Sequence, residues 1–558
     1  MTRWAYLLLG VLLLARVPSL VQPAGADQGL YTYVGARILD GGLPYRDAWD
    51  QKPPAVHFTY ALLYGLWPRD SMVSAADLVV AAAVALLLVP LGRQLGPGPA
   101  AGIVAACLFL LLGDPTFNRL AGVRIRAQCE TFIGLAMTGA LLLAAGPGSA
   151  RKPAAMFGAG LLAGIAFTFK YNAIVYGAVL IAAIAARSGV RQAWRRAPLL
   201  AAGAILPAAV LLTLFAINAT IDDLYQATVR YNLEYSGETY EAPWSFCAYL
   251  LTFPVRQARI DALWTLGGLG CLVLIAAWTR ERSRWMLLLP VAWVAMACLS
   301  IAINGSRGLP QYFVQANPAL ALAAGVAAAH LWPAAAMPAR WRPLARIVAI
   351  GIVATAVWRV NDFRKIPANA AHDLAYLAGR TSREEHLMRY GGQRNDKYSA
   401  LAVHRLGLYL GARTPSQDYV YIFGFSPGAY VKADRASASR FFWSRPVLVG
   451  FNADDPAYGA AGVLEELTAR SPKFVVLQKD DWEPAPDDSA TFFLEHPQLG
   501  SWLRSNYTRR DGFEDFDVWE RAARGAVRTQ DVSGDGMAAA PRPRERSIVS
   551  TSSSFRKR

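Results

Sequence analysis

The chain of 558 residues is 54% hydrophobic and only 17% charged. This composition excludes a string of ordinary water-soluble domains and favours a polytopic membrane protein. The formal net charge of +16 would indicate a nucleic-acid partner in a soluble protein. In a membrane protein the positions of Lys and Arg matter more than their sum, because they set the topology. We therefore expect the lipid bilayer, and no nucleic acid, as a partner.

The N-terminal segment combines features of a signal peptide and of a membrane span. Arg3, the apolar run 4–15 and the small residues 24–26 are typical of a signal peptide whose cleavage would leave Asp27 as the first residue. The apolar run continues through 17–21, however, and is then long enough to cross the bilayer. We expect an uncleaved first span, with Arg16 extending to the outer interface.

Apolar runs of roughly twenty residues predict about eleven transmembrane helices. They lie near 4–22, 72–91, 97–113, 129–146, 156–171, 173–187, 198–217, 263–279, 285–303, 310–332 and 345–359. The high content of Ala, Gly and Arg is typical of a GC-rich bacterium, so the cytoplasmic membrane of a bacterium is the expected location.

Every second loop between these spans is basic, which makes it cytoplasmic by the positive-inside rule. The N-terminus is then cytoplasmic, and the loops 23–71, 114–128, 218–262 and 304–309 face outward with everything after about 360. The basic loops contain Arg93; Arg151 and Lys152; Arg187, Arg191, Arg195 and Arg196; Arg280, Arg282 and Arg284; and Arg340, Arg342 and Arg346.

The chain changes character after residue 360, which ends the predicted membrane domain 1–360. Residues 361–523 alternate β-rich runs, at 418–425, 445–451 and 473–478, with helical stretches such as EEHLMRY and VLEELTAR. This alternation predicts a small extracytoplasmic α/β domain. Residues 524–558 are rich in Ser, Pro, Gly and Arg, and we predict a disordered basic tail because they cannot bury a core.

The first outer loop predicts two helices separated by charged residues. Apolar residues at helical spacing indicate an amphipathic helix over 27–40 that lies in the membrane interface and stops at Gly41 and Gly42. A second helix is expected to begin at Pro53 and to continue through AVHFTYALLYGLW. Asp27 is then explained as a helix N-cap and Pro53 as a helix starter. That explanation leaves out the charged residues between the helices: Arg46, Asp47, Asp50 and Lys52.

The charges of the two first outer loops suit acid–base chemistry on a phosphate-linked substrate. A carboxylate beside hydrocarbon can take a proton from a hydroxyl, while nearby cations bind a phosphate leaving group. The second loop, DPTFNRLAGVRIRAQCE, adds Arg119, Arg124, Arg126 and, at the start of the next span, Glu130. A carboxylate at a span boundary favours a functional role. The alternative for Glu130 is an ion pair with Arg126 at i, i+4 spacing.

The stretch from Asp27 to Pro54 has a recognisable pattern: an acid after the first span, Tyr and Ala at the next helical turns, a Gly break, and a Lys-Pro-Pro step before a hydrophobic helix. It resembles the polyprenol-phosphate-sugar-dependent glycosyltransferases of the GT-C fold. These include the aminoarabinose transferase to lipid A, the protein O-mannosyltransferases and the rhizobial lipopolysaccharide galacturonosyltransferases. The likeness extends over roughly residues 1–360.

The resemblance implies that Asp27 is the catalytic acid, that Lys52 binds the donor phosphate and that Glu130 is a second acid. Asp50 is a further catalytic candidate from the same loop. Candidates for the donor phosphate site beside Lys52 are Arg46, Arg124 and Arg126. Lys170 and the segment GLPQYFVQANPAL also look like family elements, so candidates for substrate contacts are Tyr31, Lys170, Gln311 and Tyr312.

Two departures from the family pattern weaken the expectation of a metal site. Gln28 follows Asp27 where many relatives have a second acid, and Gln51 precedes Lys52 where the aminoarabinose branch has an acid. They also argue against that branch. The five cysteines form no CxxC pair or Cys/His cluster. We predict no metal site and no certain cofactor, with a divalent cation left open.

The sequence favours a membrane glycosyltransferase over two other classes. It would transfer a sugar from a polyprenyl monophosphate donor to an acceptor hydroxyl of a lipid, polysaccharide or protein of the cell envelope, with inversion and with Asp27 as general base. A transporter or flippase of a lipid-linked or anionic solute predicts midplane charges and similar halves. Here only Asp77 and Lys170 lie well within apolar surroundings. The third class is a structural or assembly protein whose membrane part is only an anchor. One span suffices for an anchor, so about eleven predicted spans argue against this class. Aromatic residues in 218–262 fit either sugar stacking or an interface belt.

Overall fold

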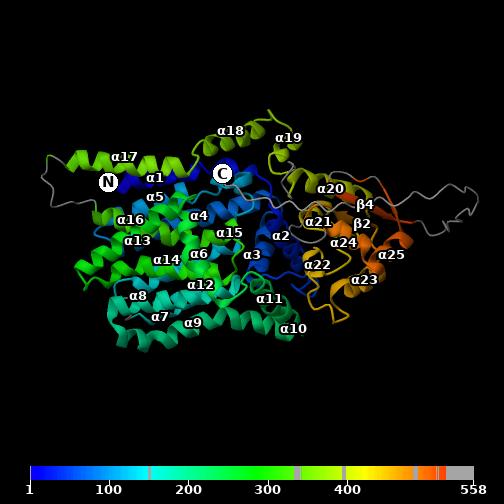
Figure 1. Cartoon of the computed structure of the whole chain (residues 1–558), viewed down its shortest axis with the longest axis horizontal. Coiled ribbons are helices and arrows are strands. Elements are labelled where there is room, and N and C mark those ends of the chain that lie inside the picture. The colour runs from blue at the N-terminus through cyan, green and yellow to red at the C-terminus, as the bar shows by residue number, and fades with distance from the viewer. Residues whose placement is uncertain are drawn as a thin grey trace, which may run out of the picture. The chain divides into compact units, whose positions relative to one another are not determined.

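The computed structural model describes residues 2–148, 152–331, 340, 342–391, 398–481, 488–510, 512 and 515–522. A bundle of long apolar helices is followed by a smaller region that contains a sheet (Figure 1). The predicted tail 524–558 lies outside the described residues, and the boundary at 360 stays a prediction. The bundle helices are α1 (Thr2–Leu14), α4 (Ser71–Leu95), α5 (Pro99–Leu112), α6 (Cys129–Ala145), α7 (Pro153–Phe169), α8 (Gly177–Ser188), α9 (Val190–Ile217), α13 (Ala262–Arg280), α14 (Leu288–Ile303), α16 (Asn317–Leu331) and α17 (Arg342–Val360).

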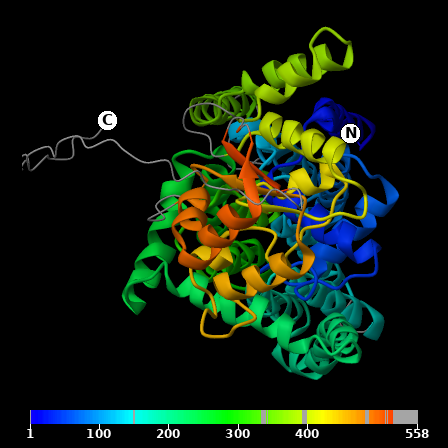
Figure 2. The same ribbon diagram turned by 90° about the vertical axis from the view of Figure 1, so that its right-hand side faces the viewer.

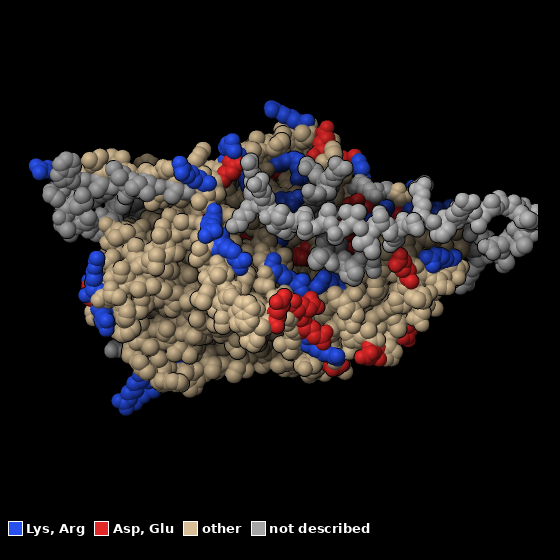
Figure 3. Space-filling model, in the orientation of Figure 1, with Lys and Arg blue, Asp and Glu red and all other residues tan. Residues whose placement is uncertain are grey.

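These helices make the chain a polytopic membrane protein. Within the described residues, 7 helical segments are long and apolar enough to cross a membrane by length and composition. Three further predicted spans fall on the shorter apolar helices α5, α6 and α7, and the last falls on α17. The face of the bundle seen in Figure 3 is a broad surface with few charges. Charged side chains gather at its left-hand end in the picture and, on the right, toward the C-terminal region. That distribution suits helices surrounded by lipid.

The two helices of the first outer loop form as predicted, at α2 (Ala26–Leu39) and α3 (Ala55–Leu66). Two details of the prediction are wrong. The N-cap of α2 is Gly25, and Asp27 lies inside the first turn, so Asp27 does not cap the helix. Residues 28–35 are all buried, so α2 does not lie exposed in an interface. The cause is tertiary, because the C-terminal region covers the face of α2 that an isolated helix would expose.

The predicted outer loop 218–262 is largely helical. It contains α10 (Ile221–Tyr225), a π-helical turn η6 (Gln226–Arg230), α11 (Tyr231–Gly237) and α12 (Pro243–Ala258). A further short helix, α15 (Pro310–Phe313), precedes α16. These elements place polar side chains against the first outer loop.

The region after α17 is a mixed α/β structure. Its four-stranded sheet has the order β1-β2-β4-β3, with β1 (Val420–Phe423) parallel to β2 (Phe474–Gln478) and β4 (Phe516–Arg521) antiparallel to both β2 and β3 (Tyr507–Arg509). The helices around it are α18 (Lys365–Leu377), α19 (Arg383–Met388), α20 (Ala400–Arg413), α21 (Gly428–Ala433), α22 (Arg445–Leu448), α23 (Gly459–Arg470), α24 (Ser489–Glu495) and α25 (Pro497–Asn506).

Most of the predicted elements of this region are confirmed. The runs at 418–425 and 473–478 contain β1 and β2, EEHLMRY overlaps α19, and VLEELTAR lies within α23. The expected strand at 445–451 is wrong, because α22 begins there. Pro446 occupies the first turn of α22, where its fixed φ favours a helix and its missing N–H costs nothing.

The C-terminal region lies over one end of the bundle and packs on the predicted first outer loop (Figure 2). The Tyr33 hydroxyl of α2 accepts a hydrogen bond from the Ser437 amide at 2.8 Å. Further along the loop, Trp443 Nε1 donates to the Trp49 carbonyl at 3.0 Å. Gly29 of α2 meets the start of α21 so closely that an added Cβ would lie 2.9 Å from the amide nitrogen of residue 428. The helix that carries Asp27 is therefore packed against the C-terminal region.

Four buried charges tie the second outer loop to the bundle. Arg16 lies 3.5 Å from Asp114 and 3.9 Å from Asp77 of α4. Arg126 lies 3.3 Å from the same Asp77, and none of the four side chains is more than 7% exposed. Two cations and two carboxylates make a neutral cluster, which is the condition for burying such groups. Arg16 is buried in this cluster and paired with Asp77 and Asp114, and its extension to the outer interface stays a prediction.

Removing the charge of Asp77 should destabilise the protein strongly. Asp77→Asn keeps the shape of the side chain but leaves Arg126 buried without its carboxylate, so we expect the free energy of unfolding to fall by about 3–5 kcal/mol. Glu281→Gln is the matched control, because its pair with Arg284 is about half exposed, at 51% and 53%. There we expect less than about 1 kcal/mol. Reversible unfolding in mixed micelles measures both variants, and equal small losses would contradict a structural role for the cluster.

Candidate active site

Asp27 presents a carboxylate at the end of the bundle that the C-terminal region covers, and it is only half-buried there. Two amide side chains from other elements donate to its Oδ2 atom: Gln128 Nε2 at 3.2 Å and, more weakly, Gln311 Nε2 at 3.5 Å. Burial raises the pKa of Asp27 above the ordinary value of 3.8, against the opposing charge of Lys52 and the hydrogen bond from Gln128. Such a carboxylate is a better proton acceptor than a fully solvated one.

Gln128 connects three elements around Asp27. Its amide nitrogen also donates to the Arg124 carbonyl at 2.8 Å, and its amide oxygen accepts from the Tyr31 hydroxyl of α2 at 3.2 Å. Gln128 is the N-cap residue of α6, two residues before Glu130. Sequence reasoning missed it. The available signal was an uncharged polar side chain between the last arginine of the loop and the first apolar turn of a span.

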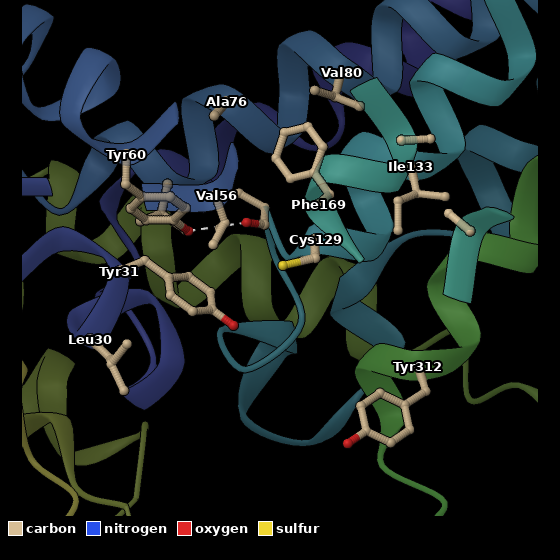
Figure 4. Packing of buried hydrophobic residues seen from close by; sticks show 14 of the residues in the cluster. Leu30, Tyr31, Val56, Tyr60, Ala76, Val80, Cys129, Ile133, Phe169 and Tyr312 are labelled. Atoms are coloured by element: carbon tan, nitrogen blue, oxygen red, sulfur yellow. Dashed lines mark hydrogen bonds between the residues drawn. The ribbon is translucent and has the colours of Figure 1, made fainter. Parts of the chain in front are cut away.

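The backbone before Gln128 is held in an unusual conformation. Ala127 has a φ of 48°, in the left-handed region that a non-glycine residue adopts only when its surroundings impose it. Its carbonyl accepts from the Tyr60 hydroxyl at 3.1 Å, the bond drawn in Figure 4. The preceding Arg126 carbonyl accepts from Gln28 Nε2 at 2.8 Å. First-loop side chains thus impose the turn that aims Gln128 at Asp27.

Glu130 pairs with Lys170, so the alternative pairing with Arg126 is wrong. Lys170 Nζ lies 2.5 Å from Glu130 Oε1, and both side chains are buried. Lys170 also lies 4.4 Å from the ring centroid of Tyr312. Arg126 cannot use i, i+4 spacing because α6 begins only at Cys129. The structure therefore brings together Glu130, Lys170 and Tyr312. Figure 4 shows Tyr312 on a separate segment from Cys129, the first residue of α6.

Lys52 lies in a turn that is bound from several sides. The Tyr45 hydroxyl donates to the Lys52 carbonyl at 2.8 Å, and Asn232 Nδ2 of α11 donates to the Gln51 carbonyl at 2.6 Å. Burial lowers the pKa of Lys52, but the carboxylates of Asp50 and Asp27 outweigh it and raise the pKa above its ordinary value. The Lys52 ammonium thus stays charged, and no carboxylate in the described part of the chain lies within 4 Å of it.

The other candidate cations are placed differently. Arg126 is turned to Asp77 and the Ala121 carbonyl inside the bundle, and so it is not beside Lys52. Arg46 is exposed and pairs with Asp47 at 2.8 Å. Arg124 is half-buried, and its carbonyl is held by Gln128. Of these cations, Lys52 is the one whose charge acts on the pKa of Asp27.

The described residues contain no group of three His, Cys, Asp or Glu side chains that could hold a metal ion. Gln28, which stands where many relatives have an acid, is fully buried and bonded to the Arg126 carbonyl. The donor set does not fit a divalent cation, and we derive no chemical step through one.

No family model matches the sequence, and no curated protein matches it. The fold is nevertheless similar to that of solved structures. The crystal structure of ArnT from Cupriavidus metallidurans bound to undecaprenyl phosphate matches with a TM-score of 0.54 at 16% identity, over 94% of this chain and 99% of that chain. The same protein in the apo state matches with a TM-score of 0.54 at 16% identity, over 93% and 98%. The GT-C fold expected from the resemblance is confirmed: over nearly its whole length the chain has the fold of ArnT.

Proposed function

We propose that the protein transfers a sugar from a polyprenyl monophosphate to an acceptor hydroxyl of the cell envelope, at the outer face of a bacterial cytoplasmic membrane. The observation that carries the proposal is the half-buried Asp27 carboxylate, which two amides orient and whose pKa the charge of Lys52 lowers against the effect of burial. The fold likeness to ArnT, which was crystallised with undecaprenyl phosphate, supports the donor class. In this proposal the N-terminus is cytoplasmic and the C-terminal region is extracytoplasmic.

The proposed step is a single displacement. The acceptor oxygen forms a bond to the anomeric carbon, the bond from that carbon to the phosphate oxygen breaks, and polyprenyl phosphate leaves with the electron pair. The acceptor proton passes to Asp27. Both amides contact Oδ2, and no described side chain donates to Oδ1, which is therefore the oxygen that accepts the proton. Direct attack inverts the anomeric centre.

The cations of the site have distinct roles in this proposal. Lys52 binds the phosphate and stabilises the charge that develops on it as the bond breaks. Lys170 is neutralised by Glu130, so we assign this pair to the wall that orients Tyr312 and the donor rather than to proton transfer. Arg126 is excluded from the donor phosphate site, because Asp77 binds it.

Asp27→Asn tests the proposal directly. Asn keeps the size of the side chain and an oxygen for the two amide donors, but it cannot accept a proton at neutral pH. We expect transfer to fall by about 10²–10⁴-fold, and a strain with this substitution should accumulate a polyprenyl monophosphate sugar as a deletion strain does. Mass spectrometry of lipid extracts measures this, with the membrane level of the variant confirmed. If the variant matches the wild type while the deletion does not, Asp27 is not the base.

The rate of transfer should fall in acid, with a midpoint that depends on Lys52. Asp27 can act as the base only in its ionised form, and its pKa is raised above 3.8. We therefore expect kcat/KM to decrease as the pH falls through that raised pKa and Asp27 becomes protonated. The charge of Lys52 lowers this pKa, so Lys52→Gln should move the acidic limb to higher pH. Lys52→Arg retains the charge and should leave the limb in place. A pH profile with purified protein and the accumulated donor measures all three, and an unshifted limb in Lys52→Gln would argue against Asp27 as the titrating group.

A further inference from the structure

Asp50 and His57 form a buried pair directly behind Lys52. Asp50 Oδ2 lies 3.3 Å from His57 Nε2, and the two side chains are 2% and 0% exposed. In the described chain, Asp50 Oδ2 and both ring nitrogens of His57 are buried without a hydrogen bond, so the 3.3 Å approach of Nε2 to Oδ2 is the closest polar contact between the two side chains. Buried polar atoms without hydrogen bonds destabilise a fold, so their retention calls for an explanation.

The burial of Asp50 excludes direct contact with an acceptor. Its residue is 1% exposed, and its Oδ1 atom accepts from the Gln51 amide at 2.7 Å, which closes a turn just before Lys52. The same turn is bound through the carbonyls of Gln51 and Lys52 by Asn232 and Tyr45. Asp50 thus acts on the backbone that carries Lys52.

At neutral pH, His57 is neutral and Asp50 is charged, and the negative charge of Asp50 favours the charged form of Lys52. Burial lowers the pKa of His57 to about 3, so the imidazole is neutral and has one N–H to donate. Burial raises the pKa of Asp50 to about 6, with Lys52 opposing the rise, so the carboxylate is still charged at neutral pH. The ring of His57 is enclosed edge-on by Tyr31 and Tyr45, with centroids at 6.1 and 5.9 Å, which leaves it no solvent to bind.

We propose that Asp50 and His57 are positioning residues that together aim the Lys52 ammonium at the donor phosphate. This inference rests on the proposed function. His57 Nε2, which lies 3.3 Å from Asp50 Oδ2, holds the carboxylate in one orientation. Asp50 Oδ1 fixes the turn, and the turn sets the direction of Lys52. Neither residue contacts substrate, and Asp50 is thereby assigned a different role from the catalytic one that the sequence predicts.

Binding of undecaprenyl phosphate to the purified full-length protein tests the pair, with intrinsic tryptophan fluorescence as the readout. His57→Phe keeps a ring of similar size but removes the donor, and we expect the affinity to weaken at least roughly tenfold because Lys52 is no longer aligned. His57→Gln restores an N–H donor and should recover most of the affinity. His372→Phe, in exposed helix α18, is the matched control and should bind as the wild type does. In the transfer reaction, His57→Phe should raise the KM for the donor more than it lowers kcat.

A second variant covers the case in which His57→Phe does not fold. Asp50→Asn keeps the shape of the side chain and removes the charge behind Lys52, and it should weaken binding to a similar extent. If His57→Phe and Asp50→Asn bind as the wild type does, or if His57→Gln loses as much as His57→Phe, the positioning role is refuted. Lys52→Gln separates this outcome from failure of the proposed function. If Lys52→Gln also binds normally, the phosphate role of Lys52 is the part that fails.

Discussion

The geometry of the site depends on a neutral cluster of four buried charges: Arg16, Asp77, Asp114 and Arg126. Asp77 accepts from the Arg126 guanidinium at 3.3 Å and from the Ala127 amide at 3.4 Å, and it thereby holds the last turn of the second outer loop. Gln128 follows directly in the chain and reaches Asp27 from that turn. Charges that are buried far from water are stable only when they are paired, and the pairing allows few alternative arrangements. The buried ion cluster therefore fixes the position of Gln128, and Gln128 in turn orients the half-buried carboxylate of Asp27.

The C-terminal region acts on the site through the first outer loop. It contacts α2 at Tyr33 and Gly29. It also contacts the segment between α2 and α3, where Trp443 donates to the Trp49 carbonyl. Trp49 is fully buried among aromatic rings from both parts of the chain. Because the loop has an amphipathic sequence, it would expose apolar side chains without this cover. The α/β region is thus part of the packing that gives the loop one conformation.

Glutamines replace acids at two positions of the family pattern, and the structure gives a physical reason for one of them. The amide of Gln28 donates to the Arg126 carbonyl, which a carboxylate at that position has no proton to do. A second acid beside Asp27 would also add a like charge next to a carboxylate whose pKa is already raised. The chain therefore uses position 28 to fasten one outer loop to the other.

Hydrophobic length and local turn chemistry let the sequence alone determine the membrane spans, the two helices of the first outer loop, strands β1 and β2, and the charged outer loops as the region of interest. These features depend on contiguous residues, so they can be predicted without the fold. Only the tertiary structure decided which charges pair. Glu130 binds Lys170, 40 positions away, and Arg126 binds Asp77, 49 positions away, whereas local spacing favoured a pair between Glu130 and Arg126. Whether a charged side chain meets substrate or a buried partner depends on elements distant in the chain, because burial makes the nearest opposite charge in space, and not in sequence, the one that counts.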